Sequence, residues 1–159
     1  MAKAQNLMVK LLWLTGVALA CGTLANLFLP MRIPWVEDWA HYIEARALKE
    51  GLPLAPLDVA HAASTSGSHL LLDARPAVDY GNGRIPSAVS LPYNSVEDAF
   101  ENVKVLLTRE QPLITYCSGL ECDDSFMLAL FLREQGFTNV VLFAGGFEAW
   151  EKAGYPVEK

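Results

Sequence analysis

The pattern of hydrophobic and polar positions separates one uninterrupted apolar segment from a longer region of short alternating elements. Residues 11–29 carry no charged side chain and are bounded by Lys10 and Arg32. A helix needs about 20 apolar residues to cross the hydrocarbon core of a bilayer, and this run has that length. The pattern therefore predicts a transmembrane helix over about residues 8–29, within an N-terminal segment 1–32.

Two other interpretations of this apolar run stay open. It is longer than the usual apolar region of a cleaved signal peptide, which argues against that alternative. Cys21 follows Leu19 and Ala20, and so suggests a lipoprotein signal, in which the lipidated cysteine follows small residues. The run continues past Cys21, however, and Ala18 stands where that signal usually has leucine. We favour an uncleaved anchor.

The charged residues around the apolar run predict its orientation. Lys3, Lys10 and the amino terminus precede the run, whereas Arg32 and then Glu37 and Asp38 follow it. Cytoplasmic segments of membrane proteins carry the excess of Lys and Arg. We therefore expect a single-pass membrane protein with its N-terminus in the cytoplasm. The rest of the chain then lies outside the cytoplasm, in the periplasm of a Gram-negative cell.

Residues 33–55 are predicted to form an amphipathic helix and a linker. Pro34 suits the start of this helix, and Gly51 suits its end. Trp35 and Trp39 are four residues apart, and indole rings favour a membrane interface. Packing of the two rings against the rest of the protein is the equal alternative.

From residue 56 to residue 159, short apolar runs alternate with helical patterns. The expected strands are 69–74, 89–92, 112–117 and 139–143, the expected helices are 95–108, 124–136 and 147–154, and a short strand and helix precede them within 52–64. Continuously apolar strands that alternate with helices are typical of a parallel sheet covered on both faces. The pattern predicts an α/β domain over residues 56–159.

One cysteine stands at the position where such a sheet places its ligands. Cys117 follows an apolar strand and precedes a loop and a helix, and ligands bind at the carboxyl ends of parallel strands. The loop amides between Ser118 and Cys122 can form a cradle for an anion. The start of the following helix stabilises a thiolate through its dipole. This arrangement predicts a reactive Cys117 that can carry a negative sulfur species.

The acidic side chains of the same loop oppose this effect. Glu121, Asp123 and Asp124 crowd the loop, which contains no Lys or Arg. A like charge at about 4 Å costs about 1 kcal/mol in water and about 4 kcal/mol at an effective dielectric of 20. The acids can therefore cancel the benefit of the dipole, and they disfavour small dianions. One of the two aspartates is expected to cap the helix.

The overall charge and the cysteine content exclude several classes of function. The formal net charge is -6, and residues 1–36 contain basic but no acidic side chains, so the rest of the chain is more acidic still. An acidic domain repels phosphate backbones, and we expect no nucleic-acid partner. Three cysteines do not form a disulfide scaffold, and no pair has the C-x-x-C spacing of a zinc site. We expect no metal.

The second thiol of the loop, Cys122, has three interpretations. It is a small apolar filler, as many free cysteines are. Alternatively, it is a resolving thiol that attacks a persulfide on Cys117 and leaves a disulfide. In the third interpretation it relays sulfur as a second acceptor. The spacing around a tight loop is compatible with a disulfide, and an oxidising compartment would favour one.

Three stretches of the chain together resemble a known family. They are LLLDARPAVDYGNGRIPSAVSLP, ITYCSGLEC and GFTNVVLFAGGFEAWEKAGYPVE, which match a D-x-R followed by a G-H-I-P-G-A-type stretch, a strand with its active-site loop, and a G-G-x-x-x-W ending. Residues 56–159 thus resemble a rhodanese (sulfurtransferase) domain. The resemblance implies a three-layer fold whose parallel sheet has about five strands, with helices on both faces. It also implies that Cys117 accepts sulfane sulfur as a persulfide, without a cofactor. The active-site loop would be Ser118, Gly119, Leu120, Glu121 and Cys122.

The chain departs from the family pattern at several positions. Arg84 and Ser87 stand where many members have His and Gly. Thiosulfate-specialised members carry Arg or Lys in the loop, which this chain lacks. Related phosphatases and arsenate reductases have a longer loop that ends in Arg, and this chain has Asp123 there. Arg84 is the nearest cation that could contact substrate, whereas Asp73 and Arg75 are interpreted as structural.

These observations lead to one favoured hypothesis and two alternatives. The favoured protein is a membrane-anchored sulfurtransferase that takes sulfur from a small molecule or a protein persulfide and passes it from Cys117 to a thiol acceptor. Residues 8–29 would bind the lipid bilayer. The first alternative is a thiol-disulfide redox protein that uses Cys117 and Cys122. The second is a non-catalytic accessory subunit of a membrane protein complex.

Overall fold

The computed structural model of the protein describes residues 2–28 and 41–159, which belong to two separate units. The first unit contains helix α1, Ala2–Phe28. Within it, Asn6–Phe28 is long and apolar enough to cross a membrane, a property that a signal sequence shares, and its side chains are not buried by the protein. The hydroxyls of Thr15 and Thr23 bond to carbonyl oxygens one turn earlier, so these two side chains leave no unpaired donor on the helix.

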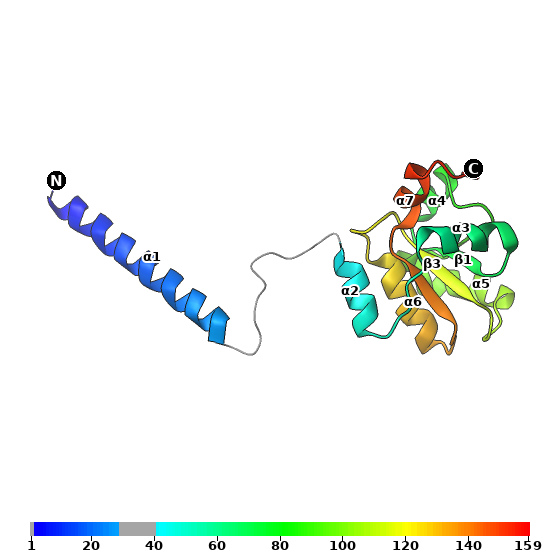
Figure 1. Ribbon diagram of the computed structural model, residues 1–159, viewed down its shortest axis with the longest axis horizontal. Helices are drawn as coiled ribbons and strands as arrows, with labels where there is room; N and C mark the ends of the chain where they lie inside the picture. The colour runs from blue at the N-terminus through cyan, green and yellow to red at the C-terminus, as the bar shows by residue number, and fades with distance from the viewer. Residues whose placement is uncertain (1, 29–40) are drawn as a thin grey trace. The chain divides into compact units, whose positions relative to one another are not determined.

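A parallel sheet forms the centre of the second unit (Figure 1). Its strands are β1 Leu70–Asp73, β2 Val89–Ser90, β3 Leu113–Tyr116 and β4 Val140–Phe143, in the order β2-β1-β3-β4. All three pairings are parallel. Strand β3 therefore has a neighbour on both sides, and the chain that leaves its carboxyl end starts from the most firmly held part of the sheet.

Six helices surround the sheet in two groups. They are α2 Tyr42–Lys49, α3 Leu57–Ser66, α4 Ala77–Asn82, α5 Val96–Val103, α6 Asp124–Glu134 and α7 Gly146–Lys152. Buried side chains of α2, α5 and α6 belong to one hydrophobic core, and those of α3 and α7 belong to a second core, against which Tyr80 of α4 also packs. The protein therefore has the expected layers of helix, sheet and helix.

Alternation of side chains along each strand explains why these strands read as continuously apolar. In β4, Val140 and Leu142 enter the first core, whereas Val141 and Phe143 enter the second. Successive side chains of a strand point to opposite faces of the sheet. Because both faces are covered, each position needs an apolar side chain, and the expected α/β fold is confirmed.

The sheet has one strand fewer than the resemblance implied. In the described part of the chain, the expected first strand is reduced to an isolated bridge between Leu54 and Leu142. Leu142 donates to the carbonyl of Pro53, and Ala55 donates to the carbonyl of Leu142. Pro53 lacks the amide hydrogen that would extend this pairing on one side, and α3 begins at Leu57 on the other, so the bridge stays isolated.

Other differences concern helix boundaries. Helix α2 ends before Gly51, whose φ of 63° confirms the predicted stop, but its expected start lies outside the described residues, as do Trp35 and Trp39. Helix α4 was not predicted, since it has only six residues and no buried side chain to give it an apolar period.

Candidate active site around Cys117

Cys117 follows directly after β3, at the carboxyl edge of the sheet, as predicted. Only 1% of the residue is exposed. The next residues form a turn in which the amide of Cys122 donates to the carbonyl of Gly119 over 3.1 Å. Helix α6 begins two residues after Cys122. The loop thus connects a rigid central strand to the N-terminus of a buried helix.

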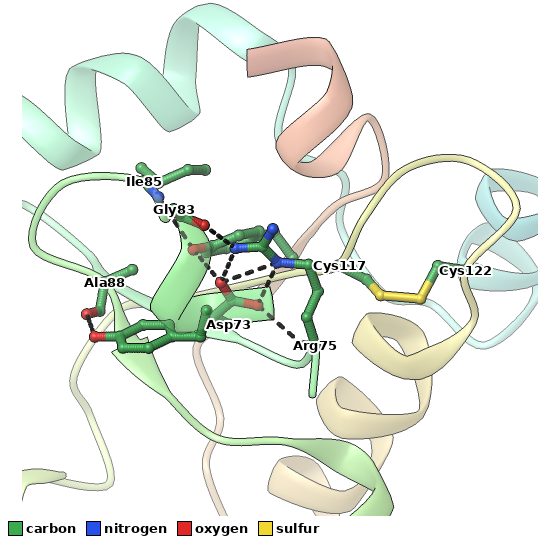
Figure 2. A network of polar contacts seen from close by, with 9 residues as sticks. Asp73, Arg75, Gly83, Ile85, Ala88, Cys117 and Cys122 are labelled. Atoms are coloured by element: carbon green, nitrogen blue, oxygen red, sulfur yellow. Dashed lines mark hydrogen bonds and ion pairs between the residues drawn. A yellow bond between two sulfur atoms is a disulfide. The ribbon is translucent and has the colours of Figure 1, made fainter. Parts of the chain in front are cut away.

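The two thiols of the loop are joined by a disulfide (Figure 2). Their Cα atoms are 6.1 Å apart, within the usual range for this bond. Cys122 is partly exposed, in contrast to the buried Cys117. Of the three interpretations of Cys122, the bond favours the resolving thiol over the apolar filler. Cys21, on α1, is a free cysteine and is exposed.

Helix α7 holds the start of the loop. The amide of Phe147 donates to the carbonyl of Cys117, and that of Glu148 donates to the carbonyl of Ser118, both over 2.8 Å. Within the described chain, the amides of residues 118–121 donate to no backbone carbonyl. The turn uses the amide of Cys122, and the anion cradle predicted for the loop would rely on the other four amides.

A glycine permits this close approach of α7 to the loop. Gly146 has a φ of 59°, in the left-handed region that side chains disfavour. A Cβ atom there would meet the carbonyl oxygen of Cys117 and lie 2.9 Å from the amide nitrogen of Gly119. Sequence reasoning used the G-G-x-x-x-W ending only to recognise the family and missed its role in shaping the site.

Asp73 and Arg75 form a buried pair beside the loop (Figure 2). The guanidinium of Arg75 donates to both carboxylate oxygens of Asp73 and to the carbonyl of Gly83. The hydroxyl of Tyr116 donates to the same carboxylate over 2.6 Å and accepts from the amide of Ile85. Both side chains of the pair therefore make contacts that are compatible with the structural role predicted for them.

The protonation of this network follows from its burial. Burial first, and then the Asp73 carboxylate, raise the pKa of Tyr116 far above its ordinary value, so its phenol stays a donor. Burial alone would lower the pKa of Arg75, but the Asp73 carboxylate raises it above its ordinary value. Arg75 also lies over the ring of Phe147, with 4.1 Å from its Cζ to the ring centroid. The network thus connects the sheet edge to α7.

The acids of the loop differ in their partners. Asp123 stands at the N-cap position of α6, but its side chain makes no capping bond and instead pairs with Arg46 of α2 over 2.9 Å. The expected cap is therefore not formed by Asp123. A carboxylate oxygen of Asp124 and both cysteine sulfurs lie within 4.8 Å of one another. Burial first, and then the charge of Asp123, raise the pKa of Asp124.

Two of the recesses beside the loop also border helix α7. The first, of about 430 Å³, is lined by residues 118–122 together with Glu148 and Lys152. The second, of about 690 Å³, includes Ser118, Arg75 and Phe147 among its lining residues. Arg84 lines neither recess; it pairs with Glu158 and lies over the ring of Tyr80. A role for Arg84 in substrate binding stays a prediction.

Comparisons with known proteins agree with this geometry. Residues 57–153 match the family model of the rhodanese-like domain, which is more than half of the chain. The thiosulfate sulfurtransferase GlpE of Actinobacillus succinogenes is 34% identical over 93 residues, covering 56% of this chain and 75% of that protein. GlpE of Pseudomonas savastanoi pv. phaseolicola is 32% identical over 103 residues, covering 65% of this chain and 90% of that protein.

Solved structures show the same fold. The BH2092 protein of Bacillus halodurans aligns with a TM-score of 0.60 at 28% identity, over 72% of this chain and 82% of that one. The human single-domain sulfurtransferase TSTD1 aligns with a TM-score of 0.56 at 22% identity, over 64% of this chain and 97% of that one. The fold and the site define an α/β domain with a cysteine at the carboxyl edge of its parallel sheet. The chain belongs to the rhodanese-like domain family, in which sulfurtransferases occur.

Proposed function

We propose that this protein is a membrane-anchored sulfurtransferase that carries sulfane sulfur on Cys117. The Cys117 thiolate attacks the outer sulfur of a donor persulfide or polysulfide. A bond forms between Sγ and that sulfur, the donor's sulfur-sulfur bond breaks, and the donor leaves as a thiolate. An acceptor thiolate then attacks the same outer sulfur, and Cys117 leaves as a thiolate. No electrons are gained or lost overall.

The observation that carries the proposal is the position of Cys117. Cys117 stands at the carboxyl end of the inner strand β3, at the start of a loop whose amides at residues 118–121 have no backbone partner among the described residues. Four such amides can share the negative charge of a persulfide. The N-terminus of α6 adds its dipole from the same side. The disulfide to Cys122 must be reduced before sulfur can be loaded.

The charges around the recess favour a thiol persulfide over thiosulfate as the donor. Glu121 and Glu148 line the recess at the loop, and its one basic side chain, Lys152, is paired with Glu148. A dianion would therefore approach two carboxylates without a free cation among these lining residues. A persulfide on a protein or small thiol carries less charge at its reactive end, so it meets less repulsion.

The test is the intact mass of the reduced full-length protein before and after exposure to a sulfur donor. We expect a gain of about 32 Da on Cys117, faster with the persulfide of a small thiol such as glutathione than with thiosulfate. Cys117→Ser should abolish transfer to a thiol acceptor, even where peptide mapping finds sulfur on the exposed thiols Cys21 or Cys122. Transfer by the Cys117→Ser variant at the wild-type rate, or no loading of Cys117 in the wild type, would reject the function and favour an accessory subunit.

We also propose that α1 is an uncleaved anchor, with its N-terminus in the cytoplasm and the rhodanese-like domain in the periplasm or another extracytoplasmic space. The length and apolar surface of Asn6–Phe28 support this. Expressed in a Gram-negative bacterium, the protein should stay in the membrane fraction after an alkaline wash and retain residues 1–32 in its intact mass. Protease added to the periplasm should digest the domain. A soluble product that lacks α1 would contradict the anchor.

A further inference from the structure

The two sulfurs of the loop are not equivalent. Cys117 is 1% exposed, whereas Cys122 is partly exposed and lines the recess of about 430 Å³. Their disulfide shows that Sγ of Cys122 can reach Sγ of Cys117 itself. In a Cys117 persulfide, that atom is the inner sulfur. An external acceptor needs the outer sulfur, so the two thiols that can attack the persulfide would attack different atoms.

A third group stands beside the two sulfurs. The Asp124 carboxylate lies within 4.8 Å of both of them, in the first turn of α6. Its neighbour Asp123 is neutralised by Arg46, but within the described chain Asp124 makes no ion pair. Its raised pKa brings its affinity for protons closer to that of a thiol. A carboxylate in this position can accept a proton from Cys122 directly or through one water.

We propose that the loop also reduces the sulfur it carries and releases it as sulfide, with Cys122 as the resolving thiol and Asp124 as its general base. The inference rests on the proposed function, because it needs the Cys117 persulfide. Asp124 takes the proton of Cys122, whose thiolate attacks Sγ of Cys117. The bond between Sγ and the outer sulfur breaks, the proton taken from Cys122 passes to the outer sulfur of the persulfide anion, and hydrosulfide leaves. Two thiol sulfurs are oxidised to one disulfide while one sulfane sulfur is reduced by two electrons.

Regeneration of the loop needs a protein dithiol as reductant. Its thiolate attacks the partly exposed Sγ of Cys122, since the sulfur of Cys117 is covered, and forms a mixed disulfide there. Cys117 then leaves as a thiolate into the loop amides. The second thiol of the reductant attacks the mixed disulfide and frees Cys122. The same loop amides thus serve the leaving thiolate of Cys117 and its persulfide.

The groups around Asp124 make its role testable, because a purely electrostatic effect and a general base would change the rate of sulfide release in opposite directions. Asp123 beside it and Glu121 in the loop are acidic, and Arg46 of α2 is engaged by Asp123. Helix α6 packs on β3 and β4, which carry no charged side chain, and on the turn Tyr93–Ser95, which has Tyr93 as its one titratable group. From α7, the paired Glu148 and Lys152 face the recess that Cys122 lines.

If Asp124 acted only by its charge, its removal would favour the Cys122 thiolate and accelerate release. If it is the base, its removal slows release.

The first experiment follows sulfide after loading. The reduced full-length protein in detergent is loaded with the persulfide of a small thiol at pH 5, desalted, and brought to higher pH without an added thiol. We expect one equivalent of sulfide and a final mass about 2 Da below that of the reduced protein. Cys122→Ser should keep its gain of about 32 Da and release little sulfide. A wild type that keeps its persulfide as Cys122→Ser does would overturn the inference while the proposed function stands.

The second experiment measures the pH dependence of release. Asp124→Asn should release sulfide at least about tenfold more slowly at pH 6.5, within the range of general acid-base catalysis. The difference should close near pH 9, where a free thiol with a pKa of about 8.5 ionises without help. Glu134→Gln is the matched control, because it removes the same charge about 15 Å away at the other end of α6. Release by Asp124→Asn that is unchanged or faster at pH 6.5 would exclude the base.

A failure at the loading step has a different meaning. If neither the wild type nor Cys122→Ser gains about 32 Da at pH 5, the persulfide itself does not form and the proposed function fails together with the inference.

Trapping with a disulfide reagent separates the roles of the two thiols further. Cys117→Ser should form a mixed disulfide at Cys122 with an aromatic disulfide reagent, and Cys122→Ser should react more slowly at Cys117. The reverse order of reactivity would contradict attack by the reductant at Cys122.

Discussion

Replacing Arg75 by Met is expected to lower the free energy of unfolding of the domain by about 3–5 kcal/mol, because it leaves a buried carboxylate without its counter-charge. Asp73 is 0% exposed, and Arg75 donates to both of its oxygens. After the substitution, the Asp73 carboxylate keeps the Tyr116 hydroxyl and the backbone amide of residue 75 as donors, neither of which is charged. Chemical denaturation of the reduced protein, followed by its tryptophan fluorescence, measures the loss.

A second ion pair between an arginine and a carboxylate provides the control for Arg75→Met. Arg84 pairs with Glu158, whose side chain is 46% exposed, so Arg84→Met should cost much less stability than Arg75→Met. The double variant Asp73→Asn, Arg75→Met should recover part of the loss, since no buried charge is left unpaired. Equal losses for Arg75→Met and Arg84→Met would show that burial does not make the first pair important.

Arg75→Met should also affect the site through α7. The guanidinium lies over the ring of Phe147, and the amide of Phe147 holds the carbonyl of Cys117. Loss of this contact loosens the residue that positions the start of the loop. We therefore expect slower sulfur loading of Arg75→Met under conditions in which the variant is fully folded. Loading of Arg84→Met at the normal rate would exclude the substrate contact predicted for Arg84.

The parts of the fold that sequence predicted are those determined by local patterns. Strands β3 and β4 are buried on both faces, so their apolar runs were unambiguous, and the position of Cys117 followed from the end of β3. Gly51 was recognised as a helix stop because its positive φ is a local requirement. The loop position was predicted correctly for the same reason: a strand, a turn and a helix follow one another without interruption.

The parts that sequence did not decide depend on contacts between distant segments. The choice among the interpretations of Cys122 required the path of the loop, since the spacing of the thiols allows a bond but does not require one. Asp123 was expected as a possible cap, but Arg46 of α2 reaches it from 77 residues away in the chain. The pairing at Leu54 is limited to a single-residue bridge next to prolines, and the sequence alone does not show which strand this segment approaches.

Substituting Gly146 by Ala is expected to cost about 3 kcal/mol or more and to slow sulfur loading of Cys117 at least about tenfold. Adopting a positive φ costs a residue with a Cβ about 1–2 kcal/mol. The remainder comes from overlap, because the new methyl group would meet the carbonyl oxygen of Cys117 and the backbone of Ser118 and Gly119. These atoms are backbone and cannot rotate away, so α7 and the loop must separate. The amides of Phe147 and Glu148 would then lose the carbonyls of Cys117 and Ser118.

Gly154→Ala isolates the effect on the loop from the effect on the backbone. Gly154 also has a positive φ, 73°, but a Cβ atom there would meet nothing within 4 Å. It should therefore show only the backbone cost, about 1–2 kcal/mol, with normal loading. The comparison uses chemical denaturation for stability and intact mass after a short exposure to polysulfide for loading. If both variants lose the same stability and load equally fast, the contact between α7 and the loop does not position Cys117. If Gly146→Ala alone loads slowly while folded, the G-G turn belongs to the catalytic apparatus as well as to the fold.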